Sequence, residues 1–158
     1  MMPDSDTKTR ANSLYERDFF SWTQEQARLL RERRFDDLDL DNLVDEVESV
    51  GGSEKRELRN RMEVLLTHLL KWKFQPRFRG PSWRRTIRQQ RDSIAQIVED
   101  SPSLRAYPSR VMSTAYTGAT LSTSEETGLA AGIFPDQCPF SLDEILDSHF
   151  FPEDPANE

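Results

Sequence analysis

Residues 53–74 read SEKRELRNRMEVLLTHLLKWKF and carry the longest apolar stripe in the chain. The apolar side chains of this stretch recur at the spacing of one helical face. They are Leu58, Met62, Leu65, Leu66, Leu69 and Leu70. Ser53 can cap the start of a helix, and Pro76 prevents its continuation. We therefore expect this stretch to form the longest buried helix and the centre of an all-α fold.

An earlier helix is indicated by the spacing of Ser13 and Glu16, which matches a capping box. This helix is expected to begin at Ser13 and to continue to about Arg34. Its inward stripe would consist of Tyr15, Phe19, Trp22, Leu29 and Leu30. Such a stripe of aromatic and aliphatic residues is typical of core packing.

A short second helix is expected between these two segments, opening near Asp39 or Asp41 and closing at Val50. Gly51 can take the left-handed conformation that ends a helix, and Gly52 follows it, so we expect a turn there. The side chains predicted to face inward are Leu40, Leu43, Val44, Val47 and Val50.

Two longer helices are expected after the central one. The first begins at Ser82 and stops before Pro102. The second runs from about Leu104 to the residue before Gly128, with a kink where Pro108 removes a backbone donor.

A short last helix is indicated by Ser141 and Glu144, which form a second capping box, and by Phe140 and Ile145, which form a hydrophobic staple. No stretch alternates with the period of a strand. The sequence thus predicts a single all-α domain over residues 13–152, a bundle of five to six helices ending in a short capped helix. Residues 1–12 and 153–158 are expected to be disordered tails.

The composition excludes several classes of protein. The chain has 158 residues, one cysteine and a formal net charge of −7. The single cysteine, Cys138, cannot form an internal disulfide, which agrees with a reducing compartment. No apolar run approaches the roughly 18 residues of a transmembrane helix, and the amino terminus does not look like a secretory signal. We expect a soluble cytoplasmic protein that does not enter a membrane.

Ordered fragments along the chain resemble a known family. Examples are Tyr15-x-x-Asp18-Phe19-x-x-Trp22, His68-Leu69-Leu70-Lys71, Glu126-Thr127-Gly128-Leu129 and Cys138-Pro139-Phe140-Ser141. Over about Leu14 to Pro152 the chain resembles the bacterial family called domain of unknown function 29. The resemblance implies an all-α fold and a bacterial source, and it carries over no catalytic or binding residue. Pro108 departs from the family pattern, which looks continuously helical at this point.

Opposite charges gather in two separate stretches. Residues 71–91 contain eight basic residues and no acidic one, interleaved with aromatic rings, whereas residues 36–48 contain seven acidic residues and no basic one. We expect the arginines to pair mainly with the acidic stretch, because guanidinium forks suit carboxylates. The arginines meant here are Arg77, Arg79, Arg84, Arg85 and Arg88. The candidate binding residues are Trp72, Arg77, Arg79, Trp83, Arg84 and Arg88.

Other uses of the basic stretch, Lys71 to Arg91, remain open. Exposed arginines beside aromatic rings could bind a protein partner or a second copy of the chain. The same residues could bind the phosphates of a nucleic acid and stack on its bases. The net charge of −7 disfavours nucleic acid, because domains that rely on it usually have a basic balance.

The acidic stretch suggests a competing class, a metal-dependent enzyme. Asp41, Asp45 and Glu48 share one helical face, and carboxylates suit Mg²⁺ or Mn²⁺. His68 could serve as a ligand or general base. Because no complete ligand set, nucleophile motif or phosphate loop is present, we expect no metal and no cofactor. The preferred interpretation is a noncatalytic interaction domain whose molecular activity the sequence does not assign.

Overall fold

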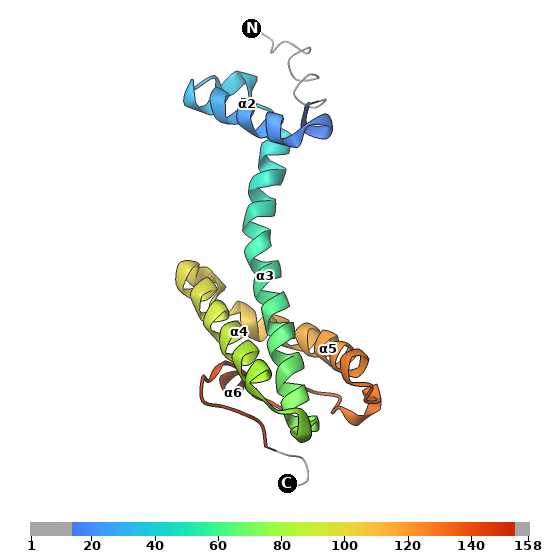
Figure 1. The fold of residues 1–158 in the computed structure, drawn as a ribbon. Helices are drawn as coiled ribbons and strands as arrows, with labels where there is room; N and C mark the ends of the chain where they lie inside the picture. Colours follow the sequence, from blue (N-terminus) through green and yellow to red (C-terminus); the bar gives the residue numbers. More distant parts are fainter. Residues whose placement is uncertain (1–13, 154–158) are drawn as a thin grey trace. The chain divides into compact units, whose positions relative to one another are not determined.

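A computed structural model describes residues 14–153, and every regular element in that range is an α-helix or a 3₁₀ turn (Figure 1). The all-α prediction is confirmed. The chain divides into two compact units, Met1–Gly52 and Ser53–Glu158, called the first unit and the second unit below. No helix within the described range is long and apolar enough to cross a membrane.

The first unit contains a helical turn at residues 14–17, helix α2 (Phe19–Arg31), turn η1 (Phe35–Asp37) and the start of α3. The expected start at Ser13 lies outside the described residues. A single helix to Arg34 was wrong, because the carboxylate of Asp18 caps a new start by accepting a hydrogen bond from Ser21 N at 3.0 Å. The helix also ends earlier, where Arg33 takes a positive φ of 56°.

Hydrogen bonds to Asp39 hold α2 and the start of α3 together. Trp22 Nε1 donates to Asp39 Oδ2 at 3.0 Å, and Asn42 Nδ2 donates to the same oxygen at 2.7 Å. The backbone N–H of Asp39 donates to Gln26 Oε1 at 2.8 Å. Since Trp22, Gln26 and Asp39 are all buried, these bonds satisfy polar groups that would otherwise be costly to bury.

Helix α3 runs without a break from Leu40–Phe74, so the expected turn at Gly51 and Gly52 is wrong. Among the described glycines, Gly128 is the one at positive φ, and neither glycine of α3 leaves the helical conformation. A glycine inside a helix costs about 1 kcal/mol relative to alanine. A break would release several backbone hydrogen bonds, which explains why the helix continues.

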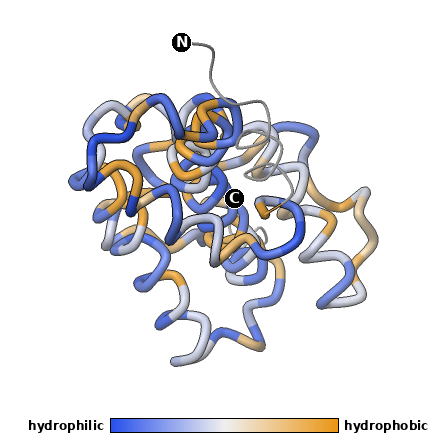
Figure 2. The backbone as a smooth tube through the Cα atoms, turned by 90° about the horizontal axis from the view of Figure 1, so that it is seen from above, coloured by the Kyte–Doolittle hydropathy of each residue, from blue (hydrophilic) through white to orange (hydrophobic). Residues whose placement is uncertain are grey.

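The core of the second unit is built around the later part of α3. Leu58, Met62, Leu65, Leu66, Leu69 and Leu70 are fully buried. Helices α4 (Pro81–Asp100) and α5 (Tyr107–Thr127) flank this part of α3 (Figure 1). Hydrophobic and hydrophilic residues alternate along the helices, the pattern of amphipathic helices (Figure 2). The predicted central stripe is confirmed.

The remaining elements of the second unit are short. Turns η2 (Pro76–Phe78), η3 (Pro102–Leu104) and η4 (Ala131–Ile133) connect the helices, and α6 (Leu142–Leu146) is the last helix of the described range. The predicted capping box of Ser141 and Glu144 at α6 is confirmed. The expected kink at Pro108 is wrong, because this proline lies in the first turn of α5, where its missing donor is not needed.

The apolar stripe of the first unit differs from its prediction. Of the side chains expected to face inward on α3, Leu43 is half-buried, whereas the others are 53% to 71% exposed. The exposed ones are Leu40, Val44, Val47 and Val50. On α2, Trp22 and Leu29 are buried, but Phe19 and Leu30 are largely exposed. The predicted burial is confirmed for Trp22 and Leu29 and is wrong for the exposed side chains.

Candidate interaction surface

The basic stretch of the sequence forms the end of α3, turn η2 and the first turns of α4. Gln75 and Pro76 stop α3, because proline cannot continue the backbone hydrogen bonds. Gly80 is extended, and Pro81 opens α4 at a position where its missing N–H is not needed. The chain therefore reverses at η2 and displays its arginines on a tight turn and on a helix.

Trp72, a predicted binding residue, is buried. Its ring lies 4.8 Å from the ring of Phe151, and the guanidinium groups of Arg79 and Arg84 lie over it at 5.4 Å and 5.2 Å. The guanidinium of Arg84 also lies 5.0 Å from the Phe151 ring. Cation–π contacts of this kind stabilise both partners. The ring of Trp72 thus packs against the guanidinium groups of Arg79 and Arg84 and helps to hold them in place.

Arg79 and Trp83, two more of the predicted residues, are half-buried. Arg79 Nε donates to the backbone oxygen of Trp72 at 2.7 Å, which ties η2 to the end of α3. Trp83 packs against the core, and Lys71 Nζ lies 5.8 Å from the centre of its ring. Lys71 also forms an ion pair with Glu126. These groups hold the turn in place.

Arg91 belongs to the same basic stretch and is buried. Its guanidinium donates to the backbone oxygens of Ile145, Glu144 and Phe150 at 2.8, 3.3 and 2.9 Å. Burial lowers the pKa of Arg91 from its usual range. This arginine joins α4 to the C-terminal segment, a structural role that the sequence did not indicate.

The remaining arginines of the stretch face solvent. Arg77 lies in η2, and Arg84, Arg85 and Arg88 lie in the first two turns of α4. Among the described residues, the side chains of Arg77, Arg85 and Arg88 form no hydrogen bond or ion pair. Phe78, between Arg77 and Arg79, is 66% exposed. Sequence reasoning did not select Phe78 or Arg85 as binding residues, although both lie in the stretch without acids.

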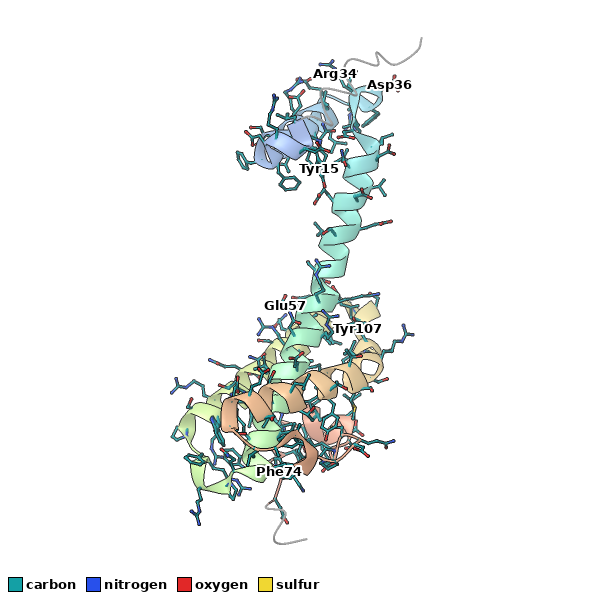
Figure 3. The ribbon with its side chains drawn as sticks, turned by 90° about the vertical axis from the view of Figure 1, so that its right-hand side faces the viewer. Tyr15, Arg34, Asp36, Glu57, Phe74 and Tyr107 are labelled. Atoms are coloured by element: carbon teal, nitrogen blue, oxygen red, sulfur yellow. The ribbon has the colours of Figure 1, made fainter. Side chains whose placement is uncertain are left out.

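The acidic stretch has partners within the first unit. Asp37 Oδ2 forms an ion pair with Arg34 Nη2 at 2.7 Å. The hydroxyl of Tyr15 points toward α3 and donates to Glu46 Oε1 at 2.5 Å (Figure 3). This hydrogen bond raises the pKa of Tyr15 from its ordinary value. The predicted pairing of the second unit's arginines with this stretch would join the two units, and it stays a prediction.

The groups named for the enzyme alternative lie in different surroundings. Asp41, Asp45 and Glu48 are exposed. His68 is half-buried, its Nδ1 lies 2.9 Å from Val64 O, and burial lowers its pKa below the ordinary value for histidine. Within residues 14–153, no group of three or more His, Cys, Asp and Glu side chains is arranged to hold a metal ion.

Three shallow hollows of about 420 to 520 Å³ mark the surface of the second unit. The most apolar of them lies between α4 and α5 and is lined by Ile94, Val98, Pro102 and Leu146. Another contains the ion pair of Glu57 and Arg61. The exposed arginines of α4 and η2 line none of these three hollows.

The model of the family described as "Domain of unknown function DUF29" matches residues 14–151. No curated protein and no solved structure matches the chain.

Proposed function

The chain belongs to the DUF29 family, and from the side chains described above we propose that it is a noncatalytic interaction domain whose second unit binds an acidic segment of a partner protein. The binding residues would be Arg77, Arg84, Arg85 and Arg88, with Phe78 as an apolar contact. Trp72, Arg79 and Trp83 would support this face from beneath. A cytoplasmic location in a bacterium belongs to the same proposal, and the lone Cys138 agrees with it.

The observation that carries this proposal is the set of arginines left unpaired at the start of α4. The amino-terminal end of a helix has a partial positive charge, so arginines there are locally unfavourable. Helix α4 has no acidic residue in its first turn to offset them. Arg84 lies in this turn, whereas Arg85 and Arg88 lie beyond it and form no ion pair with a described residue. They would become favourable when carboxylates of a partner accept their hydrogen bonds.

A protein partner is favoured over a nucleic acid because the aromatic rings of the basic stretch are mostly covered. Proteins that bind single strands stack bases on exposed aromatic faces. Trp72 is buried beneath Arg79 and Arg84, and the cation of Lys71 lies over the ring of Trp83. The net charge of −7 also opposes approach of a polyanion. In this stretch, Phe78 is the aromatic residue that is exposed beside arginines. A single exposed ring can contact one apolar side chain of a peptide, whereas a single strand of nucleic acid stacks several bases.

The test compares two double variants of equal charge change. We expect a fluorescein-labelled peptide of glutamates and leucines to bind the wild type in fluorescence anisotropy and to lose at least about tenfold in affinity with Arg85→Glu and Arg88→Glu. The control is Arg56→Glu with Arg110→Glu, two exposed arginines elsewhere on the second unit, which should retain binding.

Other outcomes would contradict the proposal. Equal loss in both variants would mean that the peptide responds to net charge alone. Tighter binding of single-stranded DNA or RNA than of the peptide, falling steeply with salt and lost only in the Arg85 and Arg88 variant, would instead assign the face to nucleic acid.

A further inference from the structure

The first unit has a core that is small for its length. Within its described part, residues 14–52, the buried side chains are Trp22, Gln26, Leu29 and Asp39, of which Trp22 and Leu29 are apolar. Small cores supply little hydrophobic stabilisation, and association with another surface can add to it. The one cysteine of the chain, Cys138, lies in the second unit. Burial of its exposed apolar side chains against another surface would therefore add stability to this unit.

The same unit exposes large apolar side chains. These are Phe19, Phe20, Leu30, Phe35, Leu40, Val44, Val47 and Val50, each 45% to 72% exposed. At about 100 Å² each, they present on the order of 800 Å². A stable interface of standard size buries about 800 Å² on each partner. Burial of most of these side chains against a second copy would thus approach the area of a standard interface.

One face of α3 is the centre of this surface. Leu40, Val44 and Val47 follow one another at intervals of four and three residues, which places them on one side of the helix. Asp41, Asp45 and Glu48 lie along the flank of the same face and are exposed. Among the described residues these three carboxylates form no hydrogen bond or ion pair.

Cations that could meet those carboxylates lie at the end of α2. Arg28 and Arg34 already pair with Glu25, Glu32 and Asp37. Arg31 and Arg33 are exposed and form no ion pair with a described residue. One unit therefore offers both signs of charge beside its apolar face. A two-fold pairing uses the same patch on both copies, so the arginines of each copy can contact the carboxylates of the other.

We propose that two copies of this chain associate through the first unit, with Leu40, Val44 and Val47 at the centre of the interface. Arg31 and Arg33 of each copy pair with Asp41 and Asp45 of the other. This inference goes beyond the proposed function, because it concerns residues of a different unit and a different partner. The dimer would present two arginine faces for acidic segments.

The first test removes the apolar centre. Sedimentation equilibrium of the full chain should show a dimer at micromolar concentration, and Val44→Ser with Val47→Ser should raise its dissociation constant by on the order of a hundredfold. Leu121→Ser with Ile133→Ser is the matched control, because these apolar side chains of the second unit are also exposed, and it should remain dimeric. Circular dichroism checks that each variant is helical.

The second test exchanges charges and does not depend on the apolar variants. Arg31→Glu with Arg33→Glu places like charges across the interface, as does Asp41→Arg with Asp45→Arg, so each protein by itself should dimerise more weakly. Mixed together, the two proteins present opposite charges at both contacts and should form a heterodimer.

Three results would overturn this proposal. The first is a wild type that stays monomeric up to its solubility limit. If that monomer binds a cationic amphipathic peptide on this face, the occupant is such a peptide and not a second copy. The second is a dimer that persists with Val44→Ser and Val47→Ser. The third is a mixture of the charge variants that forms no heterodimer. None of these results bears on the peptide binding of Arg85 and Arg88.

Discussion

The two parts of α3 carry apolar stripes of the same spacing but differ in what surrounds them. Leu58, Leu65 and Leu69 in the second unit are fully buried, because α4 and α5 pack beside them. Leu40 and Val47 in the first unit are 57% and 69% exposed. Periodicity therefore indicates which residues share a face, whereas burial depends on another element that covers this face.

The largest expected effect tests this difference directly. Leu66→Ala removes a fully buried side chain and leaves a cavity, so we expect the free energy of unfolding to fall by about 2–5 kcal/mol. Val47→Ala removes an exposed side chain, and in a dilute monomeric sample we expect a change within about 0.5 kcal/mol. Urea denaturation followed by circular dichroism measures both. Similar losses in the two variants would mean that the parts of α3 do not differ in burial.

Local signals allowed much of the fold to be predicted from the sequence. The start of α6 follows from Ser141 and Glu144, whose reciprocal hydrogen bonds involve residues three positions apart. The end of α5 follows from Gly128, which takes the left-handed conformation at φ 76°. Such signals depend on neighbours in the chain, so reading them needs no knowledge of the packing.

Features set by distant contacts were not predictable. Gly51 resembles a helix end, but α3 continues through it. Whether the helix breaks depends on the cost of the glycines relative to the backbone hydrogen bonds that a break would release. At the candidate surface, nothing in the sequence separates Arg91, which donates to three distant backbone oxygens, from Arg88, which is exposed. The basic stretch was recognised, but its division into structural and free arginines follows from the position of the C-terminal segment.

The next effect tests the junction between the two parts of α3. Gly51 is helical, and a Cβ built on it meets no atom within 4 Å. Gly51→Ala should therefore stabilise the chain by about 0.4–1 kcal/mol, because alanine restricts the unfolded chain and favours a helix. Thermal unfolding at fixed protein concentration measures the change.

A glycine with the opposite requirement is the control for this prediction. Gly128 has φ 76°, a conformation that side chains disfavour, so Gly128→Ala should destabilise the chain by about 1 kcal/mol. If Gly51→Ala is also destabilising by this amount, residue 51 ends a helix, and the two parts of α3 are separate helices as the sequence predicted.

The smallest effect concerns the environment of His68, which lies among the buried leucines of α3. Burial is the main cause of its lowered pKa, Lys71 lowers it further, and the contact with Val64 O and the charge of Glu126 act in the opposite direction. Because the folded pKa is below the unfolded one, the unfolded chain binds the proton first as the pH falls. The contribution of His68 to stability is thus fully present above about pH 6.5 and is lost as the pH falls through its folded pKa.

Comparison of variants isolates this contribution from the carboxylates that titrate in the same range. The free energy of unfolding, measured in urea between about pH 7.5 and about pH 5, should fall less steeply in His68→Gln than in the wild type. His149→Gln removes the other histidine, which is exposed, and is the matched control. Parallel slopes in all three proteins would mean that the surroundings of His68 are as hydrated as those of His149. Water would then be excluded only from the leucine face of the buried part of α3. The side of the helix on which His68 lies would be as hydrated as the exposed part of α3.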